Sequence, residues 1–325
     1  MNTDNSGAKP VLAVDIGGTK ILLALFSPDG ILLARDRIPT LDEAGYETVI
    51  RRLTEAMRVF IRRQGLAADA ISGIGVACAG GIDTGRGMVV TPSPNLPDWY
   101  DVPLAEMIGR EFDVPVRIVN DASAAALGEH RYGAGRGVND LVLLTLGTGI
   151  GGGIIIDGKL YLGACGAAAE LGHMSIADAP PCGCGNTGCL EKLASGTAVE
   201  QDAVARLERG GASLLRELTG GDVRKITARM VGDAAARGDE LAKNVIDRAA
   251  YYLGVGCVSL VNIFNPEMIV LGGGMSALGD LLVPTVRRLV DERAFGISAR
   301  VVRITVAELG NEAGVYGAAA YMMGS

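Results

Sequence analysis

The chain carries one supersecondary pattern twice. An apolar strand, a Gly-Thr turn, a second strand, an Asp-Gly turn and a third strand follow one another in residues 11–38. The same order returns in residues 141–162, about 130 residues further on. Asp-Gly between two apolar runs is a strong hairpin signal. The repeat therefore predicts two α/β halves, each opening with an antiparallel hairpin.

The rest of the chain alternates between short apolar strands and segments of helical periodicity. This alternation predicts two domains, as expected for 325 residues. We expect a small α/β domain over residues 1–138, joined by the C-terminal helix at 311–325, and a larger α/β domain over 139–310 with an insert at 164–195. The other expected elements are helices at 43–63, 122–130, 197–209, 233–261 and 313–322, and strands at 71–77, 116–119, 268–271 and 301–306.

Composition excludes several classes of protein. No run of 18 apolar residues occurs, so we expect no membrane span. A net charge of −7 argues against a nucleic-acid partner. The first ten residues are polar and contain no apolar core of a secretory signal. We therefore expect a cytoplasmic protein.

Four metal-ligand side chains gather in one short segment, namely His173, Cys182, Cys184 and Cys189. Three Cys and one His form a closed tetrahedral set, which is typical of structural zinc. Disulfides are the alternative, but they are rare in the cytosol. The Cys-x-Cys spacing is tighter than zinc sites usually show. The three remaining cysteines lie among apolar or small residues and are expected to be buried thiols, namely Cys78, Cys165 and Cys257.

Two glycine-rich turns are candidates for binding phosphate. The segment Asp15–Lys20 lacks both the dinucleotide fingerprint and the spacing of a P-loop, and it leads into a strand rather than a helix. Backbone amides of such a turn still form an anion nest, to which Thr19 adds a hydroxyl and Lys20 a cation. The segment Leu146–Gly153 is its counterpart in the second half, so the two turns together are suited to closing on one nucleotide.

Asn120 and Asp121 end a strand and begin a helix. They fit two interpretations equally: a helix N-cap, or a carboxylate general base at the carboxyl end of a strand, where open α/β sheets place their chemistry. A phosphoryl transfer to a hydroxyl needs such a proton acceptor.

The chain resembles the sugar kinases of the ROK family (repressors, open reading frames, kinases), and among them the bacterial glucokinases. The resemblance runs from Val11 to Met322, and its motifs occur in the family's order. They are DIGGTK (15–20), PNLPDW (94–99), ND (120–121), LGTGIGGG (146–153), ELGHM (170–174), CGCGNTGCLE (182–191), LGGG (271–274) and AGVYGAA (313–319).

The resemblance implies a duplicated actin-like, hexokinase-like (RNase H-like) fold of two domains with a cleft between them. It implies ATP-dependent phosphorylation of the 6-hydroxyl of glucose, with Asp121 as the general base, and the cofactors ATP, Mg²⁺ and structural Zn²⁺. It implies a homodimer. The implied sugar ligands are Asn95, Asn120, Asp121, Glu170, His173 and Glu191. The implied zinc ligands are His173, Cys182, Cys184 and Cys189. The implied nucleotide-binding residues are Gly17, Gly18, Thr19, Lys20, Gly147, Thr148, Gly149, Gly272, Gly273 and Gly274.

Other members of the family leave alternatives open. The alternatives are an N-acetylhexosamine kinase or a fructokinase, and polyphosphate in place of ATP as the phosphoryl donor. A sugar-responsive repressor would carry a helix-turn-helix before the first strand, and only ten residues precede Val11, so we expect a kinase. Two residues depart from the family pattern: Ala169 stands where Gly is usual, and Ala79 where Pro is frequent. The methyl group of Ala169 either narrows the sugar site or merely fills space.

Overall fold

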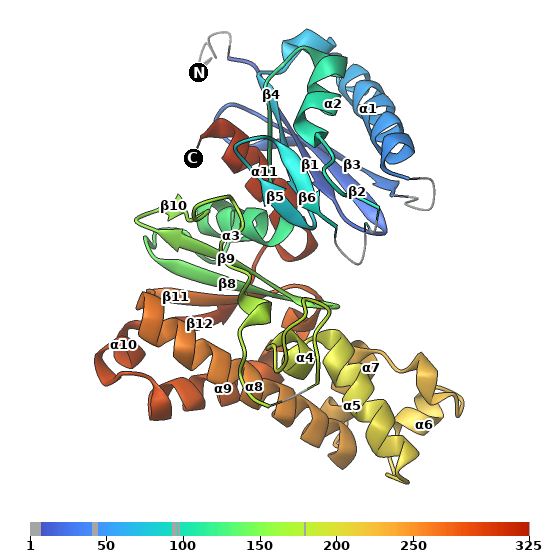
Figure 1. The fold of residues 1–325 in the computed structure, drawn as a ribbon, viewed down its shortest axis with the longest axis vertical. Coiled ribbons are helices and arrows are strands. Elements are labelled where there is room, and N and C mark those ends of the chain that lie inside the picture. The colour runs from blue at the N-terminus through green and yellow to red at the C-terminus, as the bar shows by residue number, and fades with distance from the viewer. Residues whose placement is uncertain (1–7, 41–44, 93–95, 97, 179, 325) are drawn as a thin grey trace, which may run out of the picture. The chain divides into compact units, whose positions relative to one another are not determined.

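The computed structural model describes residues 8–40, 45–92, 96, 98–178 and 180–324 (Figure 1). The chain forms two compact units. The first contains Met1–Arg136, Lys159–Ala169 and Glu312–Ser325 within the described ranges, and the second contains Gly137–Gly158 and Glu170–Asn311. Lys159–Ala169 packs with the first unit, whereas the sequence interpretation placed it in 139–310.

The first unit is built on a five-stranded sheet of order β3-β2-β1-β4-β7. The first three strands along the chain pair antiparallel, and β4 and β7 then add in parallel to β1. A two-stranded ribbon of β5 and β6 accompanies it. The strands are β1 (Val11–Ile16), β2 (Lys20–Phe26), β3 (Leu32–Pro39), β4 (Gly73–Cys78), β5 (Gly81–Asp83), β6 (Met88–Thr91) and β7 (Val116–Asn120).

Burial follows position in this sheet. The central strand β4 is buried at every residue, whereas the edge strand β3 alternates between half-buried and exposed side chains. One face of the sheet packs against α1 (Tyr46–Arg63) and α2 (Leu104–Phe112). Helix α1 contributes an apolar stripe at helical spacing, including Leu53, Met57 and Phe60.

A second pair of helices covers the opposite face, α3 (Asp121–Tyr132) and α11 (Ala313–Met323). These helices are rich in small residues, so their backbones approach closely. A methyl group added at Gly317 of α11 would lie 1.7 Å from the carbonyl oxygen of Ala124 in α3. This contact locks the C-terminal helix into the first unit, far in sequence from the residues that it touches.

The second unit repeats the sheet of the first. Within this unit the strand order is β9-β8-β11-β12, where β9 pairs antiparallel with β8, β11 pairs parallel with β8, and β12 pairs parallel with β11. The duplicated α/β pattern predicted from the sequence is therefore confirmed. The strands are β8 (Leu141–Leu146), β9 (Ile150–Ile156), β11 (Met268–Gly272) and β12 (Arg303–Val306). The two-residue strand β10 (Lys159–Leu160) falls within the segment Lys159–Ala169 of the first unit.

Helices surround the second sheet, and one of them corrects a sequence expectation. Residues 233–261 are not one helix, because the chain breaks at Gly238, whose φ is +91°. Asp239 then starts a new helix by accepting a hydrogen bond from the Ala242 amide at 2.8 Å. The helices are α4 (Glu191–Ala194), α5 (Gly196–Glu208), α6 (Leu215–Leu218), α7 (Ala228–Ala236), α8 (Glu240–Phe264), α9 (Gly279–Arg293) and α10 (Gly296–Val301).

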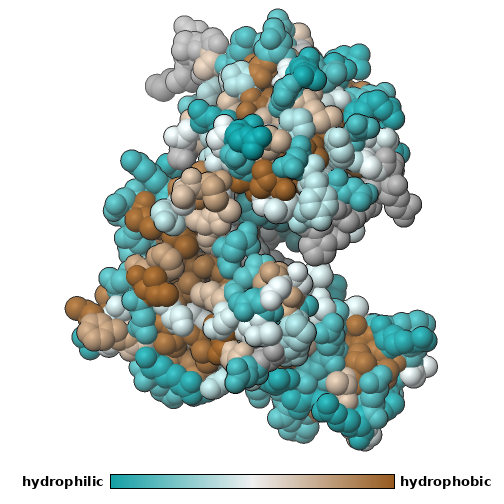
Figure 2. Space-filling model, in the orientation of Figure 1, coloured by the Kyte–Doolittle hydropathy of each residue, from teal (hydrophilic) through white to brown (hydrophobic). Residues whose placement is uncertain are grey.

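The surface of the second unit carries apolar side chains around α10 (Figure 2). Phe295 is 71% exposed, Ile297 60% and Ile263 68%. Within the described residues, no helix combines the length and apolar character needed to cross a membrane.

Candidate active site

In the first unit, the carboxyl ends of three parallel strands meet at one edge of the sheet. Ile16 of β1 pairs with Cys78 of β4, and Cys78 pairs with Asn120 of β7. This register brings Asp15 and the turn at 17–20 to the same edge as Asp121. Open α/β sheets bind their ligands at this edge.

The structure separates the roles of Asn120 and Asp121. Asn120 is the N-cap of α3, and its side-chain oxygen accepts hydrogen bonds from the amides of Ala122 at 2.9 Å and Ser123 at 3.2 Å. Its amide nitrogen donates to the Gly80 carbonyl at 3.1 Å. Asp121 is the first helical residue, and its Oδ1 accepts from the Ala122 amide at 2.9 Å. The cap is therefore centred on Asn120, while a sugar contact by Asn120 remains a prediction.

The environment of the two carboxylates changes their acidity. Burial raises the pKa of Asp121, against the opposing effect of hydrogen bonds from its neighbours, led by the Ala122 amide. Burial also raises the pKa of Asp15 to about 7, with a further increase from the Asp121 charge and an opposing effect of Lys20. Asp15 was missed as a candidate site residue, although it opens the first glycine motif.

The second unit brings its two glycine segments together. The turn after β8 is closed by a hydrogen bond from the Gly147 amide to the Gly149 carbonyl at 2.9 Å. The end of β11 pairs in parallel with β8, so that Gly272 lies opposite Thr145. The segment Gly272–Gly274 thus starts beside the turn of Gly147, Thr148 and Gly149, within one unit.

Glu191 connects this turn to the cysteine cluster. Its Oε2 lies 2.7 Å from the position that a Cβ would take on Gly149, so only glycine fits there without moving the carboxylate. Its Oε1 accepts a hydrogen bond from the Cys182 thiol at 3.1 Å. One carboxylate therefore contacts both the second glycine turn and the predicted metal ligands.

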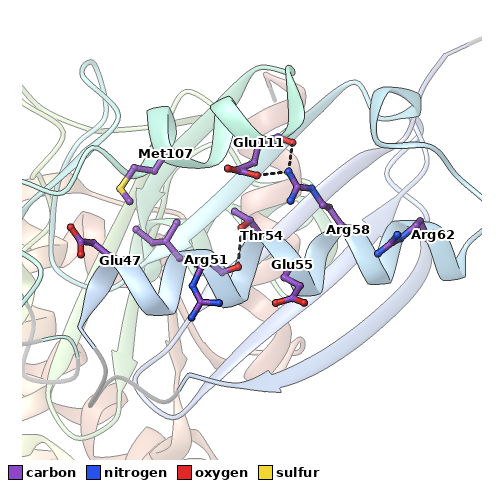
Figure 3. Close-up of a pocket in the computed structure, with 9 residues that line it drawn as sticks. Glu47, Arg51, Thr54, Glu55, Arg58, Arg62, Met107 and Glu111 are labelled. Atoms are coloured by element: carbon purple, nitrogen blue, oxygen red, sulfur yellow. Dashed lines mark hydrogen bonds and ion pairs between the residues drawn. The ribbon is translucent and has the colours of Figure 1, made fainter.

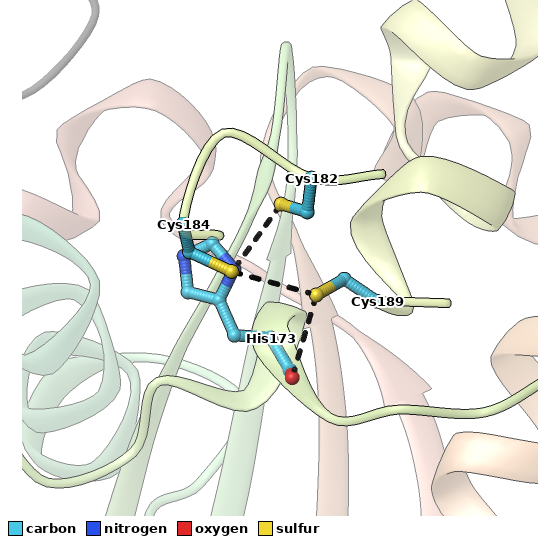
Figure 4. Close-up of side chains that lie close together, drawn as sticks. All are labelled: His173, Cys182, Cys184 and Cys189. Carbon is cyan, nitrogen blue, oxygen red and sulfur yellow. Dashed lines mark hydrogen bonds between the residues drawn. The ribbon is translucent and has the colours of Figure 1, made fainter. Parts of the chain in front are cut away.

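The four predicted metal ligands converge (Figure 4). The ligand atoms of His173, Cys182, Cys184 and Cys189 all lie within 4.8 Å of one another. The Sγ atoms of Cys184 and Cys189 are 3.7 Å apart, and the Cys182 Sγ lies 3.6 Å from His173 Nδ1. Tetrahedral zinc with Zn–S of about 2.3 Å and Zn–N of about 2.0–2.1 Å needs separations of about 3.8 Å and 3.5–3.6 Å. The donor set and its spacing therefore fit zinc.

Short backbone contacts hold this segment in place. Isolated antiparallel bridges pair Ser175 with Cys189 and Pro181 with Thr187. The Cys182 amide donates to the Asn186 carbonyl at 2.7 Å, which forms a tight knuckle around the first two thiols. Helix α4 starts two residues after Cys189, so the knuckle also fixes the origin of Glu191.

A short 3-10 turn, Leu171–His173, ends with His173, and Glu170 directly precedes it. The residue before Glu170 is unusual. The described non-glycine residues with positive φ are Asp101, Asp113, Asp157, Asn265 and Ala169, and the first four are of the types that tolerate this region. Ala169 has φ +70° and no polar side chain to compensate, so the backbone is strained beside a predicted sugar ligand.

Two sequence expectations about single residues have different outcomes. Asn95 lies outside the described residues. Cys165 was expected to be buried, which is wrong: it is exposed, because it lies in the loop after β10, whereas Cys78 and Cys257 are buried.

A groove of about 510 Å³ lies between α1 and α2 (Figure 3). None of the predicted site residues lines it. Arg58 crosses it to pair with the Glu111 carboxylate and donates to the Glu111 carbonyl at 3.1 Å. The groove contains this charge pair, and the predicted site residues of the first unit lie at the strand ends instead.

The ROK family model matches residues 11–324. The chain belongs to the ROK family. It is 37% identical to the glucokinase of Thermotoga maritima over 310 residues, which cover 95% of this chain and 96% of that protein. It is 33% identical to the xylose repressor of Caldicellulosiruptor bescii, covering 98% of this chain and 79% of the repressor.

Solved structures agree with this membership. The ROK family glucokinase from Streptomyces griseus, in complex with glucose and AMPPNP, superposes with a TM-score of 0.81 at 34% identity, over 96% of this chain and 98% of that one. The duplicated actin-like, hexokinase-like fold predicted from the sequence is confirmed. The similarities support sugar kinase activity of the hexokinase type.

The raised pKa of Asp15 predicts a pH-dependent effect of Asp15→Asn on stability. The pKa of Asp15 in the folded state, about 7, lies above its unfolded value of 3.8, so the folded state keeps the carboxyl proton to higher pH than the unfolded state does. The stability that this proton gives is fully present below pH 3.8 and is lost as the pH rises through the folded-state pKa. Asn cannot ionise, so the variant gains stability over the wild type between about pH 5.5 and pH 8.

Urea unfolding of the protein without nucleotide, sugar, added Mg²⁺ or chelator, at about pH 5.5 and about pH 8, measures this difference. Asp247→Asn, at an exposed position of α8, is the matched control and should change stability equally at both pH values. An Asp15→Asn difference that does not grow with pH would contradict the assignment.

Proposed function

We propose that this chain is an ATP-dependent glucokinase, which transfers the γ-phosphoryl group of ATP to the 6-hydroxyl of glucose and releases ADP. The observation that carries this proposal is the Asp121 carboxylate, half-buried at the carboxyl end of β7 with a raised pKa. A raised pKa makes the carboxylate a better acceptor for a hydroxyl proton. The similarity to glucokinases supports the choice of reaction.

Asp121 would take the proton of the 6-hydroxyl as that oxygen attacks the γ-phosphorus. The bond between the γ-phosphorus and the bridging oxygen breaks, and ADP leaves with the electron pair. Glu170, His173 and Glu191 are the proposed partners of ring hydroxyls, together with Asn95 and Asn120. Carboxylates and an imidazole suit this task, because each accepts hydrogen bonds in a fixed direction.

The two glycine turns are the proposed phosphate loops, with Gly17, Gly18, Thr19 and Lys20 on one and Gly147, Thr148 and Gly149 on the other. Gly272, Gly273 and Gly274 would contact the adenosine. Mg²⁺ supplies charge neutralisation of the ATP phosphates when it is bound. The Asp15 carboxylate suits its binding, because no described residue donates a hydrogen bond to it and a divalent cation would offset its buried charge.

The cysteine cluster is the proposed site of one structural zinc ion, held by His173 Nδ1 and the three thiolates. A closed set of four ligands leaves no position for substrate, so the metal would act on the shape of the loop. Coordination through Nδ1 leaves Nε2 of His173 for a sugar hydroxyl. Reduced thiols and ATP both suit a cytoplasmic enzyme.

The exposed apolar side chains around α10 support a homodimer. Val301 adds to Ile263, Phe295 and Ile297 on this surface and is 53% exposed. Exposed apolar patches often mark protein interfaces. A second copy of the chain is the proposed partner.

Glucose should be the preferred acceptor. A site that pairs each hydroxyl with a fixed partner rejects analogues by about 10⁴–10⁵-fold in strong cases, because the partners are left unpaired. Steady-state kcat/KM values for glucose, mannose, fructose, N-acetylglucosamine and N-acetylmannosamine, with ATP and with polyphosphate, measure this preference. An N-acetylhexosamine that exceeds glucose tenfold would contradict the choice of sugar. Sugar binding without any turnover would point to a sugar-responsive repressor, to which the chain is also similar.

Asp121→Asn should lower kcat by about 10²–10⁴-fold and leave the Kd for glucose nearly unchanged, because the amide keeps the shape but accepts no proton. Rapid-quench kinetics and calorimetry measure the two quantities. Asp247→Asn serves again as the exposed control. A variant that keeps more than about a third of the wild-type kcat would rule out Asp121 as the base.

The purified protein should contain about one zinc ion per chain, and Cys184→Ala should lose it and weaken glucose binding. Loss of one of four ligands removes the constraint on the loop between Glu170 and Glu191. Cys165→Ala is the matched control, since this exposed thiol lies outside the cluster and its loss should leave zinc content unchanged. Elemental analysis decides: fully active protein without zinc would refute the metal site.

A further inference from the structure

One buried threonine contacts the first glycine turn twice. Thr40 directly follows β3 and is 2% exposed. Its hydroxyl donates a hydrogen bond to the Gly17 carbonyl at 2.5 Å, and its backbone amide donates to the Thr19 carbonyl at 3.2 Å. The pairing of Lys20 with Pro39 in the β2–β3 ladder places it there.

These two contacts determine which way the turn presents its amides. In a planar trans peptide the C=O and the N–H point in opposite directions. Because Thr40 holds the Gly17 carbonyl, the Gly18 N–H points away from Thr40. Because it holds the Thr19 carbonyl, the Lys20 N–H does the same. Within the described residues, the Gly18 amide has no acceptor of its own.

A phosphate group discriminates strongly between the two faces of such a turn. Amide N–H groups attract its oxygens, whereas carbonyl oxygens repel them. The peptide between Gly17 and Gly18 joins two glycines, which rotate with little steric hindrance. A turn that was not held would therefore also populate conformations with a carbonyl facing the phosphate.

The duplicated turn of the second unit is held at the corresponding atom. The carbonyl of Gly147, the counterpart of Gly17, accepts a hydrogen bond from the amide of Gly196 at 2.8 Å. Gly196 is the first residue of α5, so an amide at a helix N-terminus donates this hydrogen bond in the second unit, where the Thr40 hydroxyl donates it in the first. Both halves of the fold capture the first carbonyl of the turn, with different donors.

We propose that Thr40 is a positioning residue for nucleotide binding, which orients the amides of the turn at Gly17–Lys20 toward a phosphate of ATP. The inference rests on the proposed function, since it takes this turn as a phosphate loop. Thr40 acts through the backbone that it holds and contributes no group to the reacting atoms.

The experiment compares Thr40→Val with Thr40→Ser. Valine keeps the volume and loses the hydroxyl, which leaves the half-buried Gly17 carbonyl without the hydroxyl donor. We expect KM for ATP and the Kd for Mg²⁺-AMPPNP to rise by about 5- to 30-fold, with the KM for glucose within about twofold of the wild type. Serine keeps the hydroxyl and should restore nucleotide affinity to within about twofold.

Thr54→Val is the matched control. Thr54 is also a buried threonine of the first unit, 4% exposed, and its hydroxyl donates to the Arg51 carbonyl at 3.0 Å within α1. A general effect of losing a buried hydroxyl would lower the melting temperature of both valine variants. Only Thr40→Val should weaken the binding of nucleotide.

Calorimetry with Mg²⁺-AMPPNP separates this inference from the proposed function. If the wild type binds the nucleotide but phosphorylates no sugar, the kinase proposal fails and the Thr40 comparison still stands. The inference is overturned if Thr40→Val binds the nucleotide as tightly as the wild type, if Thr40→Ser fails to restore affinity, or if the wild type binds no nucleotide.

Discussion

The convergence of His173, Cys182, Cys184 and Cys189 is the constraint on which the candidate site depends. The segment from Glu170 to Glu191 has little regular structure of its own, only a single 3-10 turn and isolated bridges among its described residues. Backbone hydrogen bonds such as those from Ile176 to Gly188 and from Leu190 to Met174 hold the main chain of this segment, and a bound metal would add a constraint at the side chains. The proposed tetrahedral ion at the centre of the four ligands would join the turn that carries His173 to the start of α4, and so would fix Glu191.

The duplicated sheet positions the two glycine turns that are the proposed phosphate loops. In each unit an antiparallel hairpin ends in a glycine turn beside parallel strands, and this topology places the turn where carboxyl ends meet. Glu191 then relates the two features within the second unit, since it contacts both Gly149 and the Cys182 thiol. A movement of the loop that carries Cys182 would therefore displace the Glu191 side chain beside Gly149.

Sequence patterns predicted the hairpins, the duplication and the cluster, because each depends on local spacing that physical chemistry limits strongly. Other features depend on tertiary context. Nothing in the letters Asn-Asp shows that Asn120 caps α3 while Asp121 follows it, since either side chain can reach the amides. The positive φ of Ala169 follows from the path of the chain on both sides and not from the residue. The break at Gly238 was hidden by apolar periodicity that continues on both sides of it.

X-ray absorption at the zinc edge of the purified protein tests the central claim most directly, because it reports the ligands around the metal. The account predicts one nitrogen at about 2.0–2.1 Å and three sulfurs at about 2.3 Å, with no change in this set when glucose is added. A shell of oxygens, a set of fewer than three sulfurs, or the absence of a zinc edge from active protein would contradict it.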